Sequence, residues 1–595
     1  MLLKTLRLLP RKVKIISWLS IFLVTIDVII TLVLPLFFSR FIVLMSERDK
    51  PITSVEVWGH KFWEGPRDYV FNSLVTFVVL MIVFKILINA IQIYTTSWAS
   101  EKSCEHIRSI LFAKIQKMSL KNISKFGSAS LITRVSSDIS AFWEFWLNVT
   151  GSLIRGGLLV IFSVIFSLIT DLTLSMSLLF VIPIMILTIF YVTKRTRPLM
   201  VRNRQTIDAL THDVNENITG AKIIKIYNLQ EQRQDRYNDL TQNWVKRQIT
   251  TNAVVSIGEP VFFVLINIVI VVIYILGGFS IVSNNVDPKF LGNIMIFIEY
   301  TFNVTLGVVL LSEVLIATFR AKVSTTRINA VLDMHVEHLF TGKNEQITSK
   351  NNGLDLEFRD VSFKYHSKAK ENAIENISFA LKAGEVLGII GPTGSGKSTI
   401  ANLMLNNYKY LQGSIKIDQK EIRDIDQKDF YKNVGIVYQE ALLYKGTIES
   451  NIKFANPEIT HEEMQKAFKN SCAWDFINVF EDKEKHEVEQ RGKNLSGGQK
   501  QRLSIARSLA INPKVLVLDD STSALDNITT KRVLNNIKEK YQCTTVIISQ
   551  KVGAIKNADK ILVLENGKVT GLGTHEELIQ SNDWYKQINL NQLEQ

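Results

Sequence analysis

Long apolar runs in the first half of the chain constrain its fold more than any other feature. Each of six runs is about as long as the roughly 20 residues that a helix needs to cross the hydrocarbon core of a bilayer. Within lipid, every backbone polar group must be satisfied inside the segment, so each run can cross only as a helix. We therefore predict an all-helical membrane domain over residues 1–335. Its six spans are residues 15–38, 73–95, 148–170, 172–193, 257–280 and 290–318.

Lysine and arginine residues predict the orientation of these spans. The links near residue 171 and at 283–289 carry almost none, whereas the segments 96–147 and 194–252 are rich in both. By the positive-inside rule, the N-terminus, both long segments and everything after the last span are cytosolic. Membrane-flanking residues explain the net charge of +13, because they lack the interleaved aromatics of a nucleic-acid surface. We expect a multi-pass protein of the plasma membrane with no nucleic-acid partner.

Both long cytosolic segments are predicted to be helical extensions of the spans. Apolar residues recur at helical spacing among charges between Ser100 and Met118, and again from Leu210 to Tyr227. A span that continues far into water as a helix must pack on protein, because propensity alone does not stabilise it. We interpret the extensions as struts that reach the C-terminal domain, with turns near residues 122–127 and 217–220. Solvated charged helices are the alternative.

Ionisable residues inside the predicted spans are costly in lipid and therefore informative. Such residues either line a substrate or water-filled path or pair between helices, and the sequence leaves both roles open. Two prolines, Pro35 and Pro260, are expected to kink or end their helices. The loop 44–72, which contains several aromatics, is expected at the outer surface. The ionisable residues in question are Asp27, Lys85, Arg155, Glu299 and Glu313.

A glycine-rich octapeptide dominates the second half of the chain. Residues 391–398 read GPTGSGKS, and they follow an apolar run and precede a helical pattern. This order fits the phosphate loop G-x-x-x-x-G-K-[ST], in which glycines let backbone N–H groups turn toward a polyanion. Lys397 would reach the β- and γ-phosphates, and the Ser398 hydroxyl would ligate Mg²⁺. The expected nucleotide contacts in this stretch are Gly391, Thr393, Gly394, Ser395, Gly396, Lys397, Ser398 and Thr399.

Other polar residues complete such a site. The apolar run 515–518 ends in Asp519 and Asp520. Asp519 is the expected Mg²⁺ ligand, and Asp520 stands where a general base would stand. Gln439 follows a short apolar stretch and could touch the metal ion or the attacking water. Tyr365 could stack on a nucleobase, and an ordinary strand aromatic is the alternative.

These elements and residues 495–499 (LSGGQ) occur in an order that resembles the ATP-binding cassette. With six preceding spans and two long cytosolic segments, the whole chain resembles a half-size ATP-binding cassette (ABC) exporter. The resemblance implies an α/β P-loop nucleotide-binding domain over residues 336–595, with ATP and Mg²⁺ as cofactors. It also implies a dimer in which each ATP lies between one chain's phosphate loop and the other chain's LSGGQ. The further nucleotide contacts that it implies are Ser496, Gly497, Gly498, Gln499 and Asp526.

Two residues depart from the family's pattern. The family's catalytic glutamate aligns with Asp520, and its switch histidine aligns with Gln550. A shorter carboxylate stands back from the attacking water, and an amide cannot carry a positive charge. The resemblance is therefore to the slow-site subunit of a heterodimeric exporter, whose catalytic positions here are Asp520, Gln550 and Gln439. Its expected cargo is lipophilic or amphipathic. The alternatives are a homodimeric lipid or peptide flippase and a non-transporting ATP-gated regulator.

Overall fold

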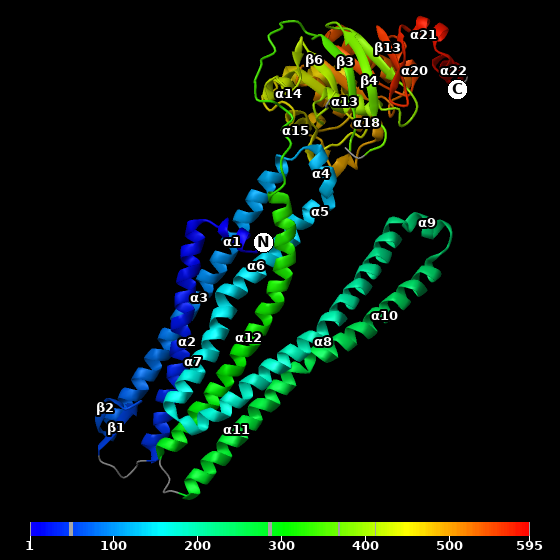
Figure 1. The fold of residues 1–595 in the computed structure, drawn as a ribbon. Helices are drawn as coiled ribbons and strands as arrows, with labels where there is room; N and C mark the ends of the chain where they lie inside the picture. The colour runs from blue at the N-terminus through cyan, green and yellow to red at the C-terminus, as the bar shows by residue number, and fades with distance from the viewer. Residues whose placement is uncertain (1, 47–51, 284–287, 367–368, 411, 594–595) are drawn as a thin grey trace. The chain divides into compact units, whose positions relative to one another are not determined.

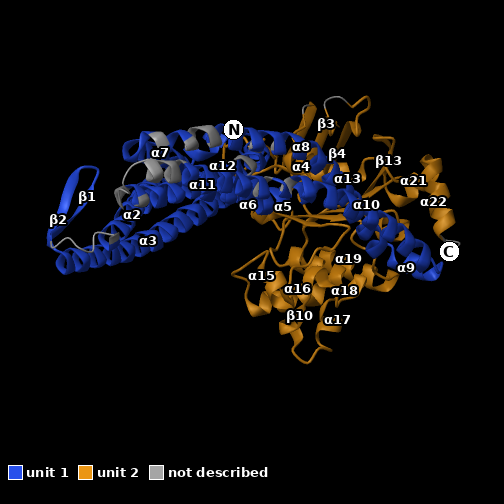
Figure 2. Ribbon diagram, turned by 90° about the horizontal axis from the view of Figure 1, so that it is seen from below, with its two compact units in different colours: residues 1–116, 129–334 blue, residues 117–128, 335–595 orange. Residues whose placement is uncertain are grey.

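The computed structural model describes every residue except 1, 47–51, 284–287, 367–368, 411 and 594–595. The chain divides into two compact units, which Figure 2 colours separately. The first unit comprises residues 1–116 and 129–334, and the second comprises residues 117–128 and 335–595. The first unit is helical apart from one small hairpin, and the second contains a six-stranded, a four-stranded and a two-stranded β-sheet with flanking helices (Figure 1).

Long helices build the first unit, as the apolar runs require. The spans predicted at 15–38, 73–95, 172–193 and 290–318 each lie within one helix, and that at 257–280 begins one residue before a helix. The span predicted at 148–170 comprises the last residue of one helix, the π-helical turn Val149–Leu153 and the helix Ile154–Thr170. Among the described residues, the helices long and apolar enough to cross a membrane are Arg11–Met45, Arg67–Gln116, Ser128–Thr170 and Gly292–Leu332, with a shorter apolar helix at Pro260–Ile275. The elements are α1 (Leu2–Arg7), α2 (Arg11–Ser46), β1 (Ile52–Val57), β2 (His60–Pro66), α3 (Arg67–Gln116), α5 (Ser128–Thr133), α6 (Ile139–Asn148), α7 (Ile154–Thr170), α8 (Leu172–Thr219), α9 (Ala221–Ile226), α10 (Gln230–Ser256), α11 (Gly258–Ser283) and α12 (Pro288–Leu332).

The predicted helical extensions are present, and they pack on one another. α3 continues to Gln116, and α8 pairs with α10 along a hairpin whose turn is α9 (Figure 1). α12 also extends beyond its apolar part and is tied to the α6 region by Arg320 to Glu144 at 2.7 Å and Ser324 to Asp138 at 2.9 Å. These contacts argue against solvated charged helices for the first extension. The tip of the α8–α10 hairpin exposes Ile226 and Tyr227, and its interpretation as a strut stays a prediction.

The first predicted turn, at residues 122–127, belongs to the second unit, and the second, at residues 217–220, lies at the end of α8, where the turn formed by α9 begins. A short helix, α4 (Leu120–Phe126), ends at Gly127, whose φ of +76° favours glycine. Asn122 donates a hydrogen bond to the His335 carbonyl at 3.1 Å. Lys121 lies 3.5 Å from Glu337. The first turn is therefore built into the same compact unit as the α/β part of the chain, as a strut that reaches that domain requires.

One charged pair explains two of the ionisable span residues. The Asp27 carboxylate of α2 is only 1% exposed, and Arg155 of α7 donates a short hydrogen bond to it. A buried carboxylate needs such a partner, since an unpaired charge there is strongly unfavourable. Asp27 and Arg155 therefore pair between helices, while Glu299 and Glu313 are exposed on α12 and Lys85 is half-buried.

The two prolines and the outer loop have these positions in the structure. α2 continues through Pro35, so this proline does not end the helix. Pro260 lies in the first turn of α11, a position that tolerates its missing N–H. The described part of the outer loop is a hairpin of β1 and β2. Its turn residue Trp58 packs on Phe166 at 4.9 Å between ring centroids, and Trp63 packs on Phe77 at 5.3 Å, so these aromatics contact protein.

The second unit is organised around a six-stranded sheet in the order β14-β13-β5-β12-β11-β8. All neighbours in it are parallel except β13 and β14, and a separate sheet has the order β4-β3-β6-β7. The elements are β3 (Leu356–Phe363), β4 (Ile374–Leu381), β5 (Val386–Ile390), α13 (Lys397–Met404), β6 (Gln412–Ile417), β7 (Lys420–Glu421), α14 (Gln427–Asn433), β8 (Val434–Val437), β9 (Gly446–Thr447), α15 (Ile448–Lys453), α16 (His461–Asn470), α17 (Trp474–Ile477), β10 (Glu487–Val488), α18 (Gly497–Leu509), β11 (Val515–Asp519), α19 (Asn527–Lys540), β12 (Thr544–Ile548), α20 (Val552–Ile555), β13 (Lys560–Glu565), β14 (Lys568–Gly573), α21 (His575–Ser581) and α22 (Asp583–Leu593).

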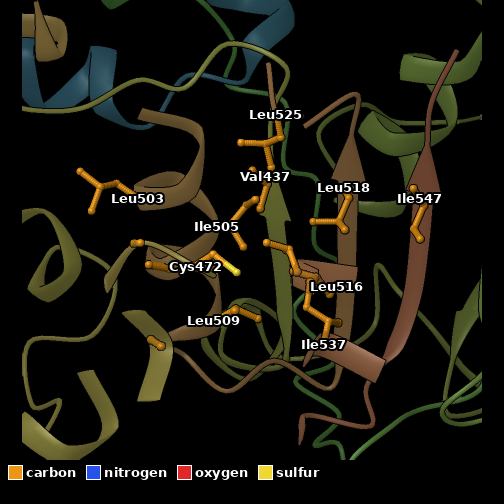
Figure 3. Close-up of a cluster of buried hydrophobic side chains, with 14 of the residues drawn as sticks. Val437, Cys472, Leu503, Ile505, Leu509, Leu516, Leu518, Leu525, Ile537 and Ile547 are labelled. Carbon is orange, nitrogen blue, oxygen red and sulfur yellow. The ribbon is translucent and has the colours of Figure 1, made fainter. Parts of the chain in front are cut away.

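Three buried strands of the six-stranded sheet position the loops that form the site. All five residues of β5, of β11 and of β12 are buried, as parallel strands covered on both faces should be. Figure 3 shows one face of this sheet, where Leu503, Ile505 and Leu509 of α18 meet the side chains of β8 and β11. α18 is therefore held firmly against the strands whose ends form the site described next.

Candidate nucleotide-binding site

The carboxyl ends of four neighbouring strands meet at one edge of the six-stranded sheet. β5, β12, β11 and β8 are adjacent and parallel, so the loops after them converge, as ligand sites in open α/β sheets do. A pocket of about 390 Å³ lies there. It is lined by Tyr365, Ala373, Thr393, Gly394, Gly396, Lys397, Ser398, Thr399, Gln439, Asp519, Asp520, Ile548, Ser549 and Gln550.

The loop between β5 and α13 has backbone geometry that only glycine tolerates. Gly394 and Gly396 have φ values of +83° and +101°, and Gly396 caps the start of α13. A Cβ atom on Gly396 would lie 2.7 Å from the Ala373 carbonyl oxygen, and one on Gly391 would lie 2.0 Å from that of Leu564. The glycines therefore let the backbone turn tightly onto the N-terminus of a helix, which is an anion-binding arrangement.

Lys397 brings a positive charge to the pocket. Its ammonium group donates hydrogen bonds of 2.8 Å to the carbonyl oxygens of both Gly391 and Pro392. Burial lowers the pKa of Lys397, and the nearby carboxylates of Asp520 and Asp519 act in the opposite direction. The cation is thus held over the loop where the phosphates of a nucleotide would lie.

Asp519 and Ser398 form a pair of oxygen ligands. The Ser398 hydroxyl donates to Asp519 Oδ1 at 3.3 Å, and the Asp519 side chain is buried at the end of β11. Burial raises the pKa of Asp519, and the neighbouring Asp520 carboxylate adds to this effect. A cation placed beside Asp519 would relieve the cost of this buried negative charge. The donor set, a carboxylate and a hydroxyl, suits Mg²⁺.

Asp520 and Gln439 also line the pocket and are hydrogen-bonded to one another. Gln439 Nε2 donates to Asp520 Oδ2 at 3.1 Å. Asp520 has a positive φ of +48°, and its backbone N–H donates to the Ile548 carbonyl at 2.9 Å. Burial raises the pKa of Asp520, while Lys397 and Lys551 lower it. The expected catalytic side chains Asp520 and Gln439 are therefore adjacent, and their geometry is set by the ends of β8, β11 and β12.

Tyr365 and Gln550 complete the pocket wall. Tyr365 lies just beyond β3, and its hydroxyl is hydrogen-bonded to Thr399 Oγ1 at 3.1 Å. Its ring packs edge-on against Tyr408, with centroids 5.1 Å apart. Gln550 is exposed in the loop after β12. The lining residues that sequence reasoning missed are Ala373, Ile548 and Ser549. Ser549 directly precedes Gln550, which the sequence marks as a candidate, whereas no sequence pattern points to Ala373.

Residues 496–499 of LSGGQ lie at the N-terminus of α18 and do not line this pocket. Ser496 caps α18 reciprocally with Gln499, and both Ser496 and Gly497 are exposed. Asp526 caps α19 through Thr529 at 2.8 Å. Among the described residues that line the pocket, none comes from residues 496–499, and neither Asp526, Gly391 nor Ser395 is present. Gly391 and Ser395 support the loop from behind, where Ser395 is buried.

Comparison with known proteins places this site in a family. The family model described as "ABC transporter" matches residues 374–523, and that described as "ABC transporter transmembrane region" matches residues 17–305. A putative ABC transporter ATP-binding protein, MG014, of Mycoplasma genitalium is 34% identical over 87% of this chain and 85% of its own length. The chain belongs to the ABC transporter family.

Other relatives of this ABC transporter refine the assignment to the exporters. The ATP-dependent lipid A-core flippase of Pasteurella multocida is 30% identical over 88% of this chain and 90% of its own length. A putative multidrug export ATP-binding/permease protein of Bacillus subtilis, YgaD, is 28% identical over 87% of this chain and 89% of its own. A bacterial Atm1-family ABC exporter with ATP bound has the same fold, with a TM-score of 0.77, 20% identity and 98% of each chain covered.

These matches establish the coarse function of the chain. It is a half-size ABC exporter of the plasma membrane, in which a helical transmembrane domain precedes an ATP-binding cassette. Such a chain works as a dimer, with a second half-transporter. The ATP-binding fold predicted from the phosphate loop, the Asp519 strand and LSGGQ is confirmed.

Proposed function

We propose that this chain is one half of a heterodimeric exporter of a lipophilic or amphipathic substrate, and that its own nucleotide site hydrolyses ATP slowly. One observation carries the proposal. Asp520 and Gln550 lie in the same pocket as an intact phosphate loop and the Asp519–Ser398 pair. The groups that would bind ATP and Mg²⁺ are thus present. The family's glutamate, which would activate water, and its histidine, which would sense the γ-phosphate, are replaced by Asp520 and Gln550.

The geometry around Asp520 supports slow turnover. Its carboxylate already accepts a hydrogen bond from Gln439 and is drawn electrostatically toward Lys397 and Lys551. An aspartate reaches one methylene less far than a glutamate, and a displacement of about 1 Å costs on the order of 10²-fold in rate. Gln550 can donate a hydrogen bond to a γ-phosphate but cannot add a positive charge there. The shorter carboxylate and the uncharged amide should therefore both slow the hydrolysis of ATP more than they weaken its binding.

The residues present fit Mg²⁺ and ATP. Ser398 Oγ and Asp519 Oδ1 lie 3.3 Å apart, as neighbouring ligands of one cation could. The described residues hold no group of three or more His, Cys, Asp or Glu side chains that could bind a metal. The proposed ligands are therefore Ser398, Asp519 and, at the edge of the pocket, Gln439, with phosphate oxygens completing the set. When bound, Mg²⁺ would neutralise phosphate charge, while Lys397 and the loop N–H groups hold the phosphates.

Exposed residues of this chain offer contacts to a second half-transporter. Ser496 and Gly497 are exposed at the N-terminus of the 13-residue helix α18, which favours a negatively charged ligand. We place the γ-phosphate of the partner's ATP against them. The tip of the second extension also exposes apolar side chains, since Ile226 is 77% and Tyr227 is 70% exposed beside α9. A cassette of the second half-transporter would cover this tip, and the membrane would hold residues 1–335 with residues 336–595 in the cytosol.

The names of relatives support the substrate class. One relative is named a lipid A-core flippase, and another is named a putative multidrug export protein. Both names are compatible with a lipophilic or amphipathic cargo. The flippase also supports a second candidate function, namely a homodimer that moves a lipid and contains two weak sites.

Purification tests the pairing. The chain is produced alone and is also captured with an affinity tag from its native membranes, together with whatever half-transporter accompanies it. We expect weak, non-cooperative ATPase from the chain alone and brisk ATPase from the captured complex. Brisk, cooperative ATPase from the chain alone would refute both the heterodimer and the slow site, whereas weak ATPase from both samples, with no second half-transporter captured, would favour the flippase homodimer.

A further inference from the structure

A glutamine of α22 holds the loop that carries Gln550. Gln592 Nε2 donates to the Gln550 carbonyl oxygen at 2.8 Å, and Gln592 Oε1 accepts from the Val552 backbone N–H at 2.7 Å. One side-chain amide therefore bridges residues 550 and 552, on both sides of Lys551. Two hydrogen bonds from a single planar group fix both the position and the orientation of this short segment.

The helix that carries Gln592 is itself firmly anchored. Tyr585 is fully buried, and its hydroxyl is hydrogen-bonded to His575 Nδ1 at 2.7 Å. Ile588 packs against the same apolar core. Tyr585, Ile588 and Gln592 follow one another at helical spacings of three and four residues, so they share one face of α22. Gln592 itself is exposed, and it lies two helical turns beyond the buried Tyr585, on the face by which α22 is anchored.

The loop has few other supports near Gln550. Ser549 is tied to the sheet by its N–H, which donates to the Ile389 carbonyl at 3.1 Å. The Ser549 hydroxyl accepts from the Lys551 N–H at 3.0 Å. These bonds hold the loop on its strand side, while Gln592 holds it from the α22 side. The Gln550 side chain, which lines the nucleotide pocket, projects from the backbone between these two supports.

We infer that Gln592 is a positioning residue that holds the Gln550 loop so that the Gln550 amide reaches the γ-phosphate of bound ATP. This inference rests on the role proposed above for Gln550. It assigns to α22 a part in distinguishing ATP from ADP, because only ATP offers the group that Gln550 would contact. Residues of the phosphate loop bind both nucleotides and do not depend on Gln592.

The test uses the full-length chain in lipid nanodiscs. Affinities for Mg²⁺ with a non-hydrolysable ATP analogue and for Mg²⁺ with ADP are measured by displacement of a fluorescent nucleotide. We expect Gln592→Ala and Gln550→Ala each to lower the ratio of the two affinities by about tenfold, the effect of one lost hydrogen bond to a charged group. ADP affinity should stay unchanged. The matched control is Asn591→Ala, an exposed neighbour, which should leave the ratio unchanged.

A second variant separates the two hydrogen bonds. Gln592→Glu keeps an acceptor for the Val552 N–H but can no longer donate to the Gln550 carbonyl. Hydrogen exchange of the Val552 amide without nucleotide should therefore accelerate in Gln592→Ala and stay slow in Gln592→Glu, while both variants lose selectivity for the ATP analogue. An unchanged ratio in Gln592→Ala with a lowered ratio in Gln550→Ala would overturn the positioning role alone. An unchanged ratio in both would overturn the role of Gln550 as well.

Discussion

Restoring the two replaced side chains should convert the slow site into a competent one. In the structure, the Asp520 carboxylate lies 3.1 Å from Gln439 and is only partly buried, so the pocket of about 390 Å³ has room for one more methylene. Asp520→Glu moves the carboxylate forward by about 1 Å, which corresponds to roughly 10²-fold in rate. Gln550→His then supplies a group that can carry positive charge beside the γ-phosphate.

The assay is phosphate release by the full-length chain in nanodiscs at saturating ATP. We expect the double variant Asp520→Glu/Gln550→His to raise kcat by about 10²-fold, with little change in ATP affinity. Asp520→Glu alone and Gln550→His alone should each raise kcat by less than additive effects would give, because two groups that act on one water molecule are not independent. The control adds Lys397→Ala to the double variant, and this should abolish the gain by removing phosphate binding at the same site.

One outcome would refute the argument that Asp520 and Gln550 limit the rate of ATP hydrolysis. If the double variant binds ATP as the parent chain does and yet hydrolyses it no faster, the two departures do not limit turnover. The site would then be slow for a different reason, or would already be competent.

Three further predictions concern binding and stability. Asp519→Asn should remove the Mg²⁺ dependence of ATP binding. Because burial raises the pKa of Asp519, this carboxylate should become protonated, and Mg²⁺–ATP affinity should fall, at a higher pH than for an aspartate of ordinary pKa. Binding titrations of the parent chain across pH will measure this. Gly391→Ala should lower the free energy of unfolding by about 1–3 kcal/mol, since its Cβ would meet the Leu564 carbonyl, whereas Gly553→Ala, which faces open space, should be neutral in thermal unfolding. Arg155→Leu should destabilise the membrane unit by about 3–5 kcal/mol by leaving Asp27 unpaired, and adding Asp27→Asn should recover part of the melting temperature.

The sequence predicted those parts of the fold that depend on local pattern. The apolar stretches 386–390 and 515–518 lie in strands β5 and β11, and the glycine spacing of residues 391–398 placed a tight loop at the start of α13. The turn near residues 122–127 was also predicted, and its last residue, Gly127, has the positive φ that glycine tolerates. Local physics decides these features, so one sequence suffices.

Features that depend on tertiary packing could not be predicted. Asp27 and Arg155 are far apart in sequence, and only the packing of α2 against α7 brings them together. Pro35 lies inside a long helix although its ring removes a backbone hydrogen bond, a case where context overrides propensity. Gln592 has no sequence signal, because a glutamine on a polar helix is ordinary until the loop that it contacts is known.

The central claim is that two chains share each ATP and that this chain's own pocket contributes little to turnover. The most direct test measures ATPase activity of the complex captured from native membranes. Ser496→Asp keeps a residue that can cap α18 but sets a negative charge against the partner's γ-phosphate, and Ser496→Asn is its neutral control. We predict that Ser496→Asp abolishes activity, whereas Asp520→Asn in this chain's pocket leaves most of it. Full activity with Ser496→Asp, or complete loss with Asp520→Asn, would contradict the account.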